Sequence, residues 1–383
     1  MSYGESLDKL QYMLNDDEVL LDKYFCEEIR QTLRQRIIGV SLGAEVGEEP
    51  LTDEEIWHSF RFAYPLHVFG YNWLQSNADS AKLLQDYIAG VFRIYAGRLA
   101  CHKVILITHS MGGLVARHYS ENMGGQNSIL GIIHGVMPDL GSPTAYRRMK
   151  TGERGISGAI IGESAKSLMP VLAQSPGPLQ LLPGTAYGPG WLKIVGSAGT
   201  QSLPKSDPYT EIYLNQTDWW RLYEAGISGG RPEDEWEEYK TTIETKVKKF
   251  IEKLSGKYHP QTWAFYGASE KNRSDDVLIW HEHSVRGTAF GYPEFIQPTE
   301  RLASGKLYRL SSAGGPGDGT VPLKSGHLPS HRVMGLLASD VDHEAAYAFA
   351  PVNRDLSVFS DTSDVLLFTL RAVVKLVRQV ASP

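Results

Sequence analysis

Residues 104–113 read Val-Ile-Leu-Ile-Thr-His-Ser-Met-Gly-Gly, and this stretch decides the fold. Its first four residues are apolar, as in a strand that is buried on both faces of a parallel sheet. The run passes without a linker into Ser110 and two glycines, and a helical pattern begins at Leu114. A buried strand that turns directly into a helix is typical of a doubly wound sheet. The stretch therefore predicts an α/β protein with a mostly parallel central sheet and helices on both faces.

Strands and helices alternate on both sides of this stretch. Helical segments carry apolar residues at helical spacing, and short β-branched or aromatic runs lie between them. We expect helices over residues 6–33, 78–98 and 363–380, and strands over 66–71, 129–136, 261–267 and 332–337. Because this alternation covers most of the chain outside one long insertion, we interpret residues 1–383 as a single domain.

Residues 143–258 interrupt the alternation. They are rich first in glycine and proline and then in aromatic residues, and they end in a helix that begins at Pro232. We interpret them as a cap inserted between core strands. Trp191, Trp219 and Trp220 suit a surface that binds acyl chains and headgroups, including transient contact with a membrane surface. The sequence leaves open whether these aromatic residues instead form the core of the cap itself.

Ser110 stands at the turn between the predicted strand and helix. A serine hydroxyl is a weak nucleophile unless a base removes its proton. In the α/β-hydrolase fold the nucleophile occupies such an elbow, with small residues two positions before and after it. Gly112 fits this pattern, whereas Thr108 replaces the usual glycine. Ser110 is the predicted nucleophile and the backbone N–H of Met111 the predicted oxyanion donor; a serine that only caps the helix is the alternative.

An acidic residue and a histidine are expected after the serine, in that order. Asp318 lies in the glycine-bounded turn Gly317-Asp318-Gly319, which could aim its carboxylate at a histidine. His327, His331 and His343 follow it. We predict His343 as the base because it comes after the last predicted strand, where the histidine of this fold lies. Asp318 is the predicted acid that orients it, and a solvated carboxylate in an ordinary turn is the alternative.

Several segments in this order resemble one group of lipases. They are the Ser110 elbow, Gly135–Pro143, Thr262–Gly267, Gly317–Pro322 and the His343 loop. Together they resemble the lecithin:cholesterol acyltransferase and GPI-inositol deacylase group. Within it, residues 135–146 resemble bacterial lipase-like proteins, some of which are antibacterial type VI secretion effectors. Tyr71-Asn72-Trp73 resembles the Tyr-Asp-Trp motif of the group, with asparagine in place of aspartate.

This resemblance implies ester hydrolysis or acyl transfer on lipids, with Ser110, Asp318 and His343 as the triad. The pattern is incomplete before Ser110, where only two strands are predicted and no proline-glycine oxyanion loop is found. Residues 36–43 form the only apolar segment with glycines there. We therefore expect a domain without its amino-terminal strands, and loss of one oxyanion donor lowers turnover by about 10²–10³-fold.

Two functions of different classes follow from the sequence. The first is a serine esterase or lipase that hydrolyses lipid esters through an acyl-enzyme. The second is an impaired or non-enzymatic protein that binds a lipid or a partner and keeps the triad residues. Nucleic-acid binding is not expected, because the formal charge is −6 and Lys and Arg form no long basic block.

No metal or cofactor is predicted. Asp340, Asp342 and Glu344 flank His343, but their spacing is not that of a six-coordinate oxygen site. The two cysteines, Cys26 and Cys101, are far apart in sequence and are expected to be free thiols. The chain shows no signal peptide and no apolar run of about 20 residues. We expect a cytoplasmic protein as synthesised, with leaderless export left open.

Overall fold

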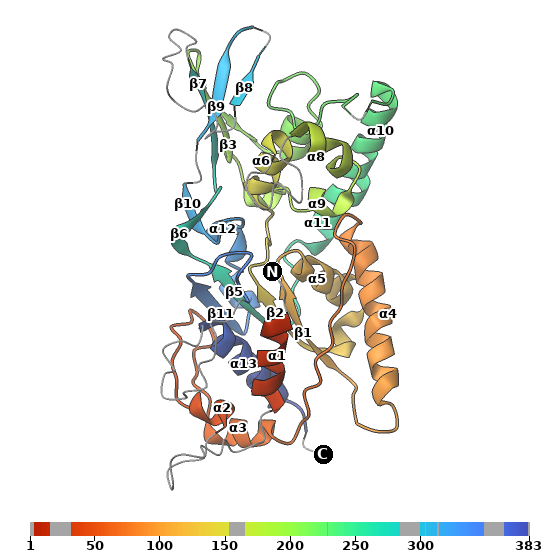
Figure 1. The fold of residues 1–383 in the computed structure, drawn as a ribbon, viewed down its shortest axis with the longest axis vertical. Coiled ribbons are helices and arrows are strands. Elements are labelled where there is room, and N and C mark those ends of the chain that lie inside the picture. The colour runs from red at the N-terminus through yellow and green to blue at the C-terminus, as the bar shows by residue number, and fades with distance from the viewer. Residues whose placement is uncertain are drawn as a thin grey trace.

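The computed structural model describes residues 4–15, 32–152, 165–227, 229–283, 299–302, 304–311, 314–347 and 364–381. It has two halves, a core built on a parallel sheet and a cap built on a second sheet and several helices (Figure 1). The N-terminal helix and the C-terminal helix both lie in the core half (Figure 1).

The core sheet has four parallel strands in the order β1-β2-β5-β11. Their bounds are β1 (Val104–His109), β2 (Ile129–Gly135), β5 (Thr262–Gly267) and β11 (Gly335–Ser339). This arrangement confirms the predicted α/β class. The strand expected over 332–337 begins later, because residues 330–332 form a 3-10 turn after Pro329.

Helices cover both faces of this sheet because neighbouring residues of each strand point to opposite faces. Ile105 and Ile107 pack into one apolar cluster with the helices α1, α3 and α13. Val104 and Leu106 pack into another cluster with α4 and α5. The helix bounds are α1 (Gly4–Asn15), α2 (Leu33–Arg36), α3 (Asp53–Ser59), α4 (Asn77–Tyr95), α5 (Gly112–Asn122) and α13 (Asp364–Val377). The part of the predicted 6–33 helical run from 16 to 31 lies outside the described residues.

The prediction of a strand over residues 66–71 is wrong. These residues form no ladder, and they are half-buried or exposed. They do lie near β1, since Leu66 packs with one apolar cluster and Phe69 and Tyr71 with the other. An alternating apolar pattern suits a strand, but a strand also needs a hydrogen-bonding neighbour. In the described part of the chain no strand precedes β1, which is therefore an edge strand there.

The cap contains a five-stranded sheet of order β4-β3-β7-β9-β8. Its strands are β3 (Leu192–Gly196), β4 (Gly199–Leu203), β7 (Leu278–His283), β8 (Thr299–Arg301) and β9 (Leu307–Leu310). Three of these strands come after residue 258, so the predicted range 143–258 does not contain the whole sheet. The sheet is completed by a segment that follows core strand β5.

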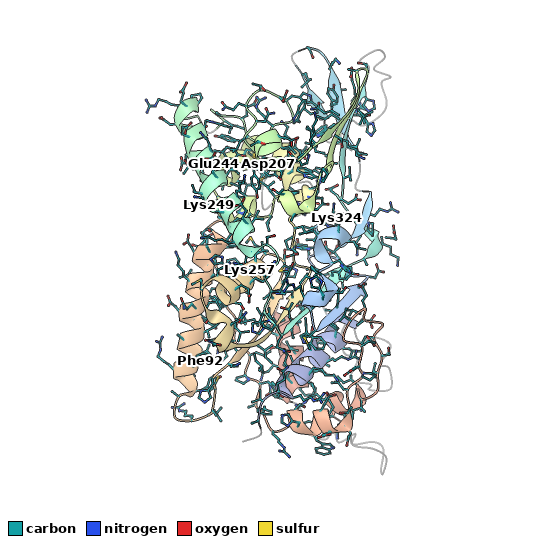
Figure 2. All side chains as sticks on the ribbon, turned by 180° about the vertical axis from the view of Figure 1, so that it is seen from behind. Phe92, Asp207, Glu244, Lys249, Lys257 and Lys324 are labelled. Atoms are coloured by element: carbon teal, nitrogen blue, oxygen red, sulfur yellow. The ribbon has the colours of Figure 1, made fainter. Side chains whose placement is uncertain are left out.

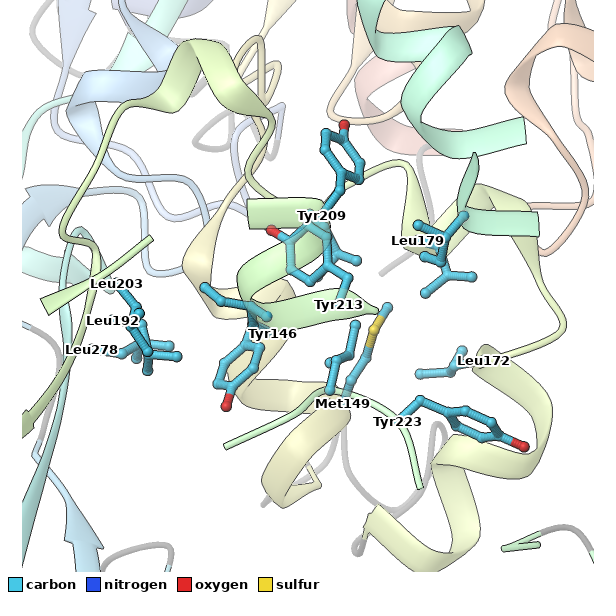
Figure 3. Packing of buried hydrophobic residues seen from close by; sticks show 14 of the residues in the cluster. Tyr146, Met149, Leu172, Leu179, Leu192, Leu203, Tyr209, Tyr213, Tyr223 and Leu278 are labelled. Atoms are coloured by element: carbon cyan, nitrogen blue, oxygen red, sulfur yellow. The ribbon is translucent and has the colours of Figure 1, made fainter. Parts of the chain in front are cut away.

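Helices pack against this sheet around an aromatic core. They are α6 (Pro143–Thr151), α8 (Ala165–Leu172), α9 (Pro176–Leu179), α10 (Pro232–Thr242) and α11 (Lys249–Leu254), with a π-helical segment over Ile243–Lys248. Tyr146, Met149 and Tyr213 lie together in the middle of that core (Figure 3). A small two-stranded sheet, β6 (Ser269–Ser274) and β10 (Gly315–Gly317), and helix α12 (Leu323–Gly326) lie between cap and core (Figure 1).

Arg117 joins the two halves where the chain first enters the cap and where it first returns to the core. Its guanidinium forms a buried ion pair with Asp139, at the start of the cap. It also donates to the carbonyl oxygens of Leu254 (2.8 Å) and Lys257 (2.9 and 3.1 Å), where the chain returns. The hydroxyl of Tyr258 donates to Asp139 at 2.7 Å. Figure 2 shows Lys257 at the level where the two halves meet.

In the described part of the chain no helix is long and apolar enough to cross a membrane. Of the two cysteines, Cys26 lies outside that part, and Cys101 is a free thiol whose pKa is raised by burial.

The Arg117–Asp139 pair gives a direct test of how the halves are held. Replacing Arg117 by methionine leaves the Asp139 carboxylate buried without its cation, which costs about 3–5 kcal/mol. We expect that loss in the free energy of unfolding measured with guanidinium chloride. Lys82→Met is the matched control, because Lys82 pairs with Asp79 at 2.8 Å on an exposed surface, where ion pairs contribute little. Equal losses in the two variants would contradict this account of the network.

Candidate active site

The backbone at Ser110 is strained in the way a nucleophile elbow requires. Strand β1 ends at His109 and helix α5 begins at Gly112, so the chain reverses within two residues. Ser110 has a φ of 50°, in the left-handed region that side chains rarely adopt. Two backbone hydrogen bonds hold it there: Ser110 N–H donates to Gly135 O at 2.9 Å, and Gly113 N–H donates to Ser110 O at 2.9 Å. Strain held in this way is common at functional sites.

The structure brings Ser110, His343 and Asp318 together. Ser110 Oγ lies 2.9 Å from His343 Nε2, and His343 Nδ1 lies 2.8 Å from Asp318 Oδ2. His327 is elsewhere, with its Nε2 2.9 Å from a carboxylate oxygen of Glu45. Of the histidines considered from sequence, His343 is therefore the one with the geometry of a general base.

The proton positions in this chain of hydrogen bonds follow from the surroundings of Asp318. Its side chain has no exposed surface, and its other oxygen accepts the N–H groups of Thr320 (2.9 Å) and Val321 (2.6 Å). Both N–H groups donate to Oδ1, so Oδ2 is left to accept a hydrogen bond from the His343 ring. Nδ1 of His343 then carries the proton, and Nε2 is left to accept the Ser110 hydroxyl. This is the protonation that a general base beside a serine needs.

Met111 places its backbone N–H at the start of α5. In the described residues that N–H has no hydrogen-bond acceptor, so it is available to an oxyanion. Two amides of the upstream segment 36–43 are engaged away from Ser110. Gly39 N–H donates to Leu51 O at 3.1 Å, and Leu42 N–H donates to the Glu48 carboxylate. The residues that follow, 45–46, pair with β11, which is the opposite edge of the sheet from β1.

The three tryptophans predicted to bind substrate lie in or against the aromatic core of the cap. Trp191 is 1% exposed. Trp219 stacks on Tyr308 with ring centroids 4.6 Å apart, and Trp220 packs against the same cluster. Their positions correspond to the alternative that the sequence left open, in which the aromatic residues form the interior of the cap.

A pair of residues explains the departure from the usual elbow sequence. Thr108 and His134 are register neighbours on β1 and β2, and Thr108 Oγ1 lies 3.0 Å from His134 Nδ1. Thr108 therefore gives a buried histidine a hydrogen-bond partner, a task that glycine could not perform. Burial lowers the pKa of His134 to about 3. The sequence signal for this pair is His134, a polar residue within the apolar run 129–136. The site predicted from sequence did not include it.

Gly267 is a second residue that our sequence analysis missed. It ends strand β5 directly beside the turn Gly317–Gly319 that carries Asp318, which we call the acid turn. A Cβ at this position would lie 2.5 Å from Asp318 Cβ and 2.7 Å from Asp318 N. Only glycine therefore allows the acid turn to pack this closely on the sheet.

The parallel sheet, the strained elbow and the hydrogen-bonded serine, histidine and aspartate define an α/β-hydrolase fold. Residues 53–152 match the family model of the PGAP1-like alpha/beta domain. The crystal structure of the Tle4-Tli4 complex contains a similar chain: the match covers 99% of this chain and 81% of that chain, with a TM-score of 0.80 and 25% sequence identity. No curated protein matches the sequence. These findings confirm the predicted resemblance and the predicted fold.

In the described residues no group of three or more His, Cys, Asp or Glu side chains could hold a metal ion.

The close approach at Gly267 predicts a selective effect of one methyl group. Gly267→Ala should push the acid turn away from the sheet and lower the free energy of unfolding by about 1–3 kcal/mol. Gly90→Ala in helix α4 is the matched control, since the added methyl group meets only an Arg93 nitrogen at 3.8 Å. Thermal or denaturant unfolding measures both. A loss in Gly90→Ala as large as in Gly267→Ala would contradict the steric explanation.

The buried His134 predicts a dependence of stability on pH. In the folded state it stays neutral down to about pH 3, whereas in the unfolded chain it binds a proton below about pH 6.5. Between these values the unfolded state binds more protons, so stability falls as pH falls. Relative to His134→Asn, the wild type should lose about 2 kcal/mol more between pH 7.5 and pH 5.

Unfolding free energies of both proteins at the two pH values provide this test. The difference at pH 7.5 serves as the control, because it reports the change in packing alone. Parallel pH profiles of the wild type and the variant would contradict the prediction.

Proposed function

We propose that this chain is a serine hydrolase of carboxylic esters whose substrates are lipids. The observation that carries the proposal is the hydrogen-bonded series from Ser110 Oγ through the His343 ring to the buried Asp318 carboxylate. In this proposal Ser110 is the nucleophile, His343 the general base and Asp318 the acid that orients the imidazole.

The proposed reaction has two halves. His343 Nε2 takes the proton of Ser110 as Oγ attacks the ester carbonyl, and the tetrahedral oxyanion meets the N–H of Met111. His343 then gives this proton to the leaving alcohol, which departs and leaves an acyl-enzyme. In the second half His343 takes a proton from water as the water oxygen attacks the acyl carbonyl. The bond from Ser110 Oγ to the acyl carbon then breaks, the acid is released, and His343 returns the proton to Ser110 Oγ. Asp318 stays ionised and stabilises the imidazolium that forms in each half.

Two observations support a substrate bound between core and cap. Ser142 Oγ donates to Thr320 O at 2.6 Å, and Arg148 Nη2 donates to Thr320 Oγ1 at 3.1 Å. The first residues of the cap therefore contact the turn that carries Asp318. The similarity to the PGAP1-like domain and to Tle4 supports a lipase-like protein. A cap next to the triad is where a lipase would hold an acyl chain.

Substitution of the triad tests this proposal. Ser110→Ala and His343→Ala should each lower kcat on p-nitrophenyl esters by about 10³-fold or more, and the double variant should lose little further, because the residues act as a unit. Ser197→Ala is the matched control, since Ser197 is exposed in the cap and bonds to Glu282. Hydrolysis that survives Ser110→Ala would contradict the assignment.

One observation favours the second candidate function, a lipid-binding or partner-binding protein without turnover. In the described residues Met111 supplies the one oxyanion N–H that we can assign, and the amides of Gly39 and Leu42 are engaged elsewhere. A series of esters of increasing acyl length separates the two functions when combined with vesicle binding. Turnover that depends on Ser110 supports the hydrolase. Vesicle binding equal in wild type and Ser110→Ala, with no turnover of any ester, supports the binding protein.

A further inference from the structure

His109 connects the end of the nucleophile strand to the loop that carries His343. Its Nε2 lies 2.8 Å from the carbonyl oxygen of His343, and the two rings have centroids 5.1 Å apart. A carbonyl oxygen only accepts hydrogen bonds, so Nε2 of His109 carries a proton and donates it. A second hydrogen bond joins the same two segments in the opposite direction, since Tyr347 Oη donates to Thr108 O at 3.0 Å.

The backbone of His343 is thereby held on both sides. Its N–H donates to Asp318 O at 2.8 Å, and its C=O accepts from His109. His343 belongs to no helix or strand, so no regular ladder fixes these two peptide groups. Fixing both of them fixes the direction of the Cα–Cβ bond, and with it the place of the imidazole relative to Ser110.

We propose that His109 is a positioning residue for His343, an inference that rests on the hydrolase function proposed above. It acts through the backbone of the base and does not touch the reacting atoms. Displacement of a catalytic group by about 1 Å can cost 10²-fold in rate. Removing the donor at position 109 should therefore lower kcat and leave substrate binding intact.

Two variants separate this role from simple packing. His109 packs beside the Tyr347 ring. His109→Leu retains a side chain that can pack there but removes the N–H donor. His109→Gln keeps an N–H donor at a similar reach. We expect His109→Leu to lower kcat on a p-nitrophenyl ester by about 10–100-fold, with KM changed less than about twofold. We expect His109→Gln to keep most of the wild-type kcat. Circular dichroism and thermal unfolding check that both variants fold.

Each outcome has a defined meaning. Equal kcat in His109→Leu and His109→Gln, whether both fall or neither does, overturns the positioning role, as does a loss confined to KM. Failure of the proposed function is recognised separately. In that case Ser110→Ala would hydrolyse the p-nitrophenyl ester no more slowly than the wild type.

A second readout needs no turnover. Proton NMR of the whole protein can follow the His343 Nδ1–H shared with Asp318, assigned by its loss in Asp318→Asn. This signal should broaden or shift in His109→Leu and stay near its wild-type position in His109→Gln. An unchanged signal in His109→Leu overturns the inference.

Discussion

The reversal of the chain at Ser110 is the constraint on which the rest of the site depends. A φ of 50° is a strained conformation for serine, and it costs free energy. It persists only where the surrounding structure stabilises it. The cost is met by the parallel pairing of β1 with β2 and by the bond from Ser110 N–H to Gly135 O. Because the elbow is fixed, the serine hydroxyl and the Met111 N–H have defined directions. The sheet therefore sets the position of the Ser110 hydroxyl, and His343 and Asp318 complete the triad beside it.

The cap is joined to this fixed point by buried polar groups. Arg117 lies on α5, the helix that starts at the elbow. Its guanidinium binds the segment near Asp139, where the chain first enters the cap, and the segment near Lys257, where it first returns. At the other side Ser142 and Arg148 contact Thr320, next to the acid turn. A shift of the cap would therefore disturb both the elbow helix and the acid turn. The triad and the cap are therefore linked through these contacts.

Sequence alone predicts the parts of this protein that are encoded by short local patterns. The Ser110 elbow, the Gly317–Gly319 turn and the loop position of His343 each combine a residue type with an adjacent turn. Features that depend on distant partners could not be predicted in this way. Residues 66–71 have a strand-like pattern but no pairing neighbour in the described part, and the cap sheet takes β7, β8 and β9 from beyond residue 258. Tryptophan is a residue type that suits a lipid contact, which is why Trp191 was predicted to bind substrate. Its burial depends on packing partners far away in the sequence, as far as Leu310.

The central claim is that the His343–Asp318 pair activates Ser110 as a nucleophile. A fluorophosphonate probe tests this most directly, because it phosphonylates only an activated serine, and peptide mass spectrometry identifies the labelled residue. The account predicts one label on the native protein, at Ser110, that is absent in His343→Ala and after denaturation. An unlabelled native protein, or a label at Ser110 that persists in His343→Ala, would contradict it.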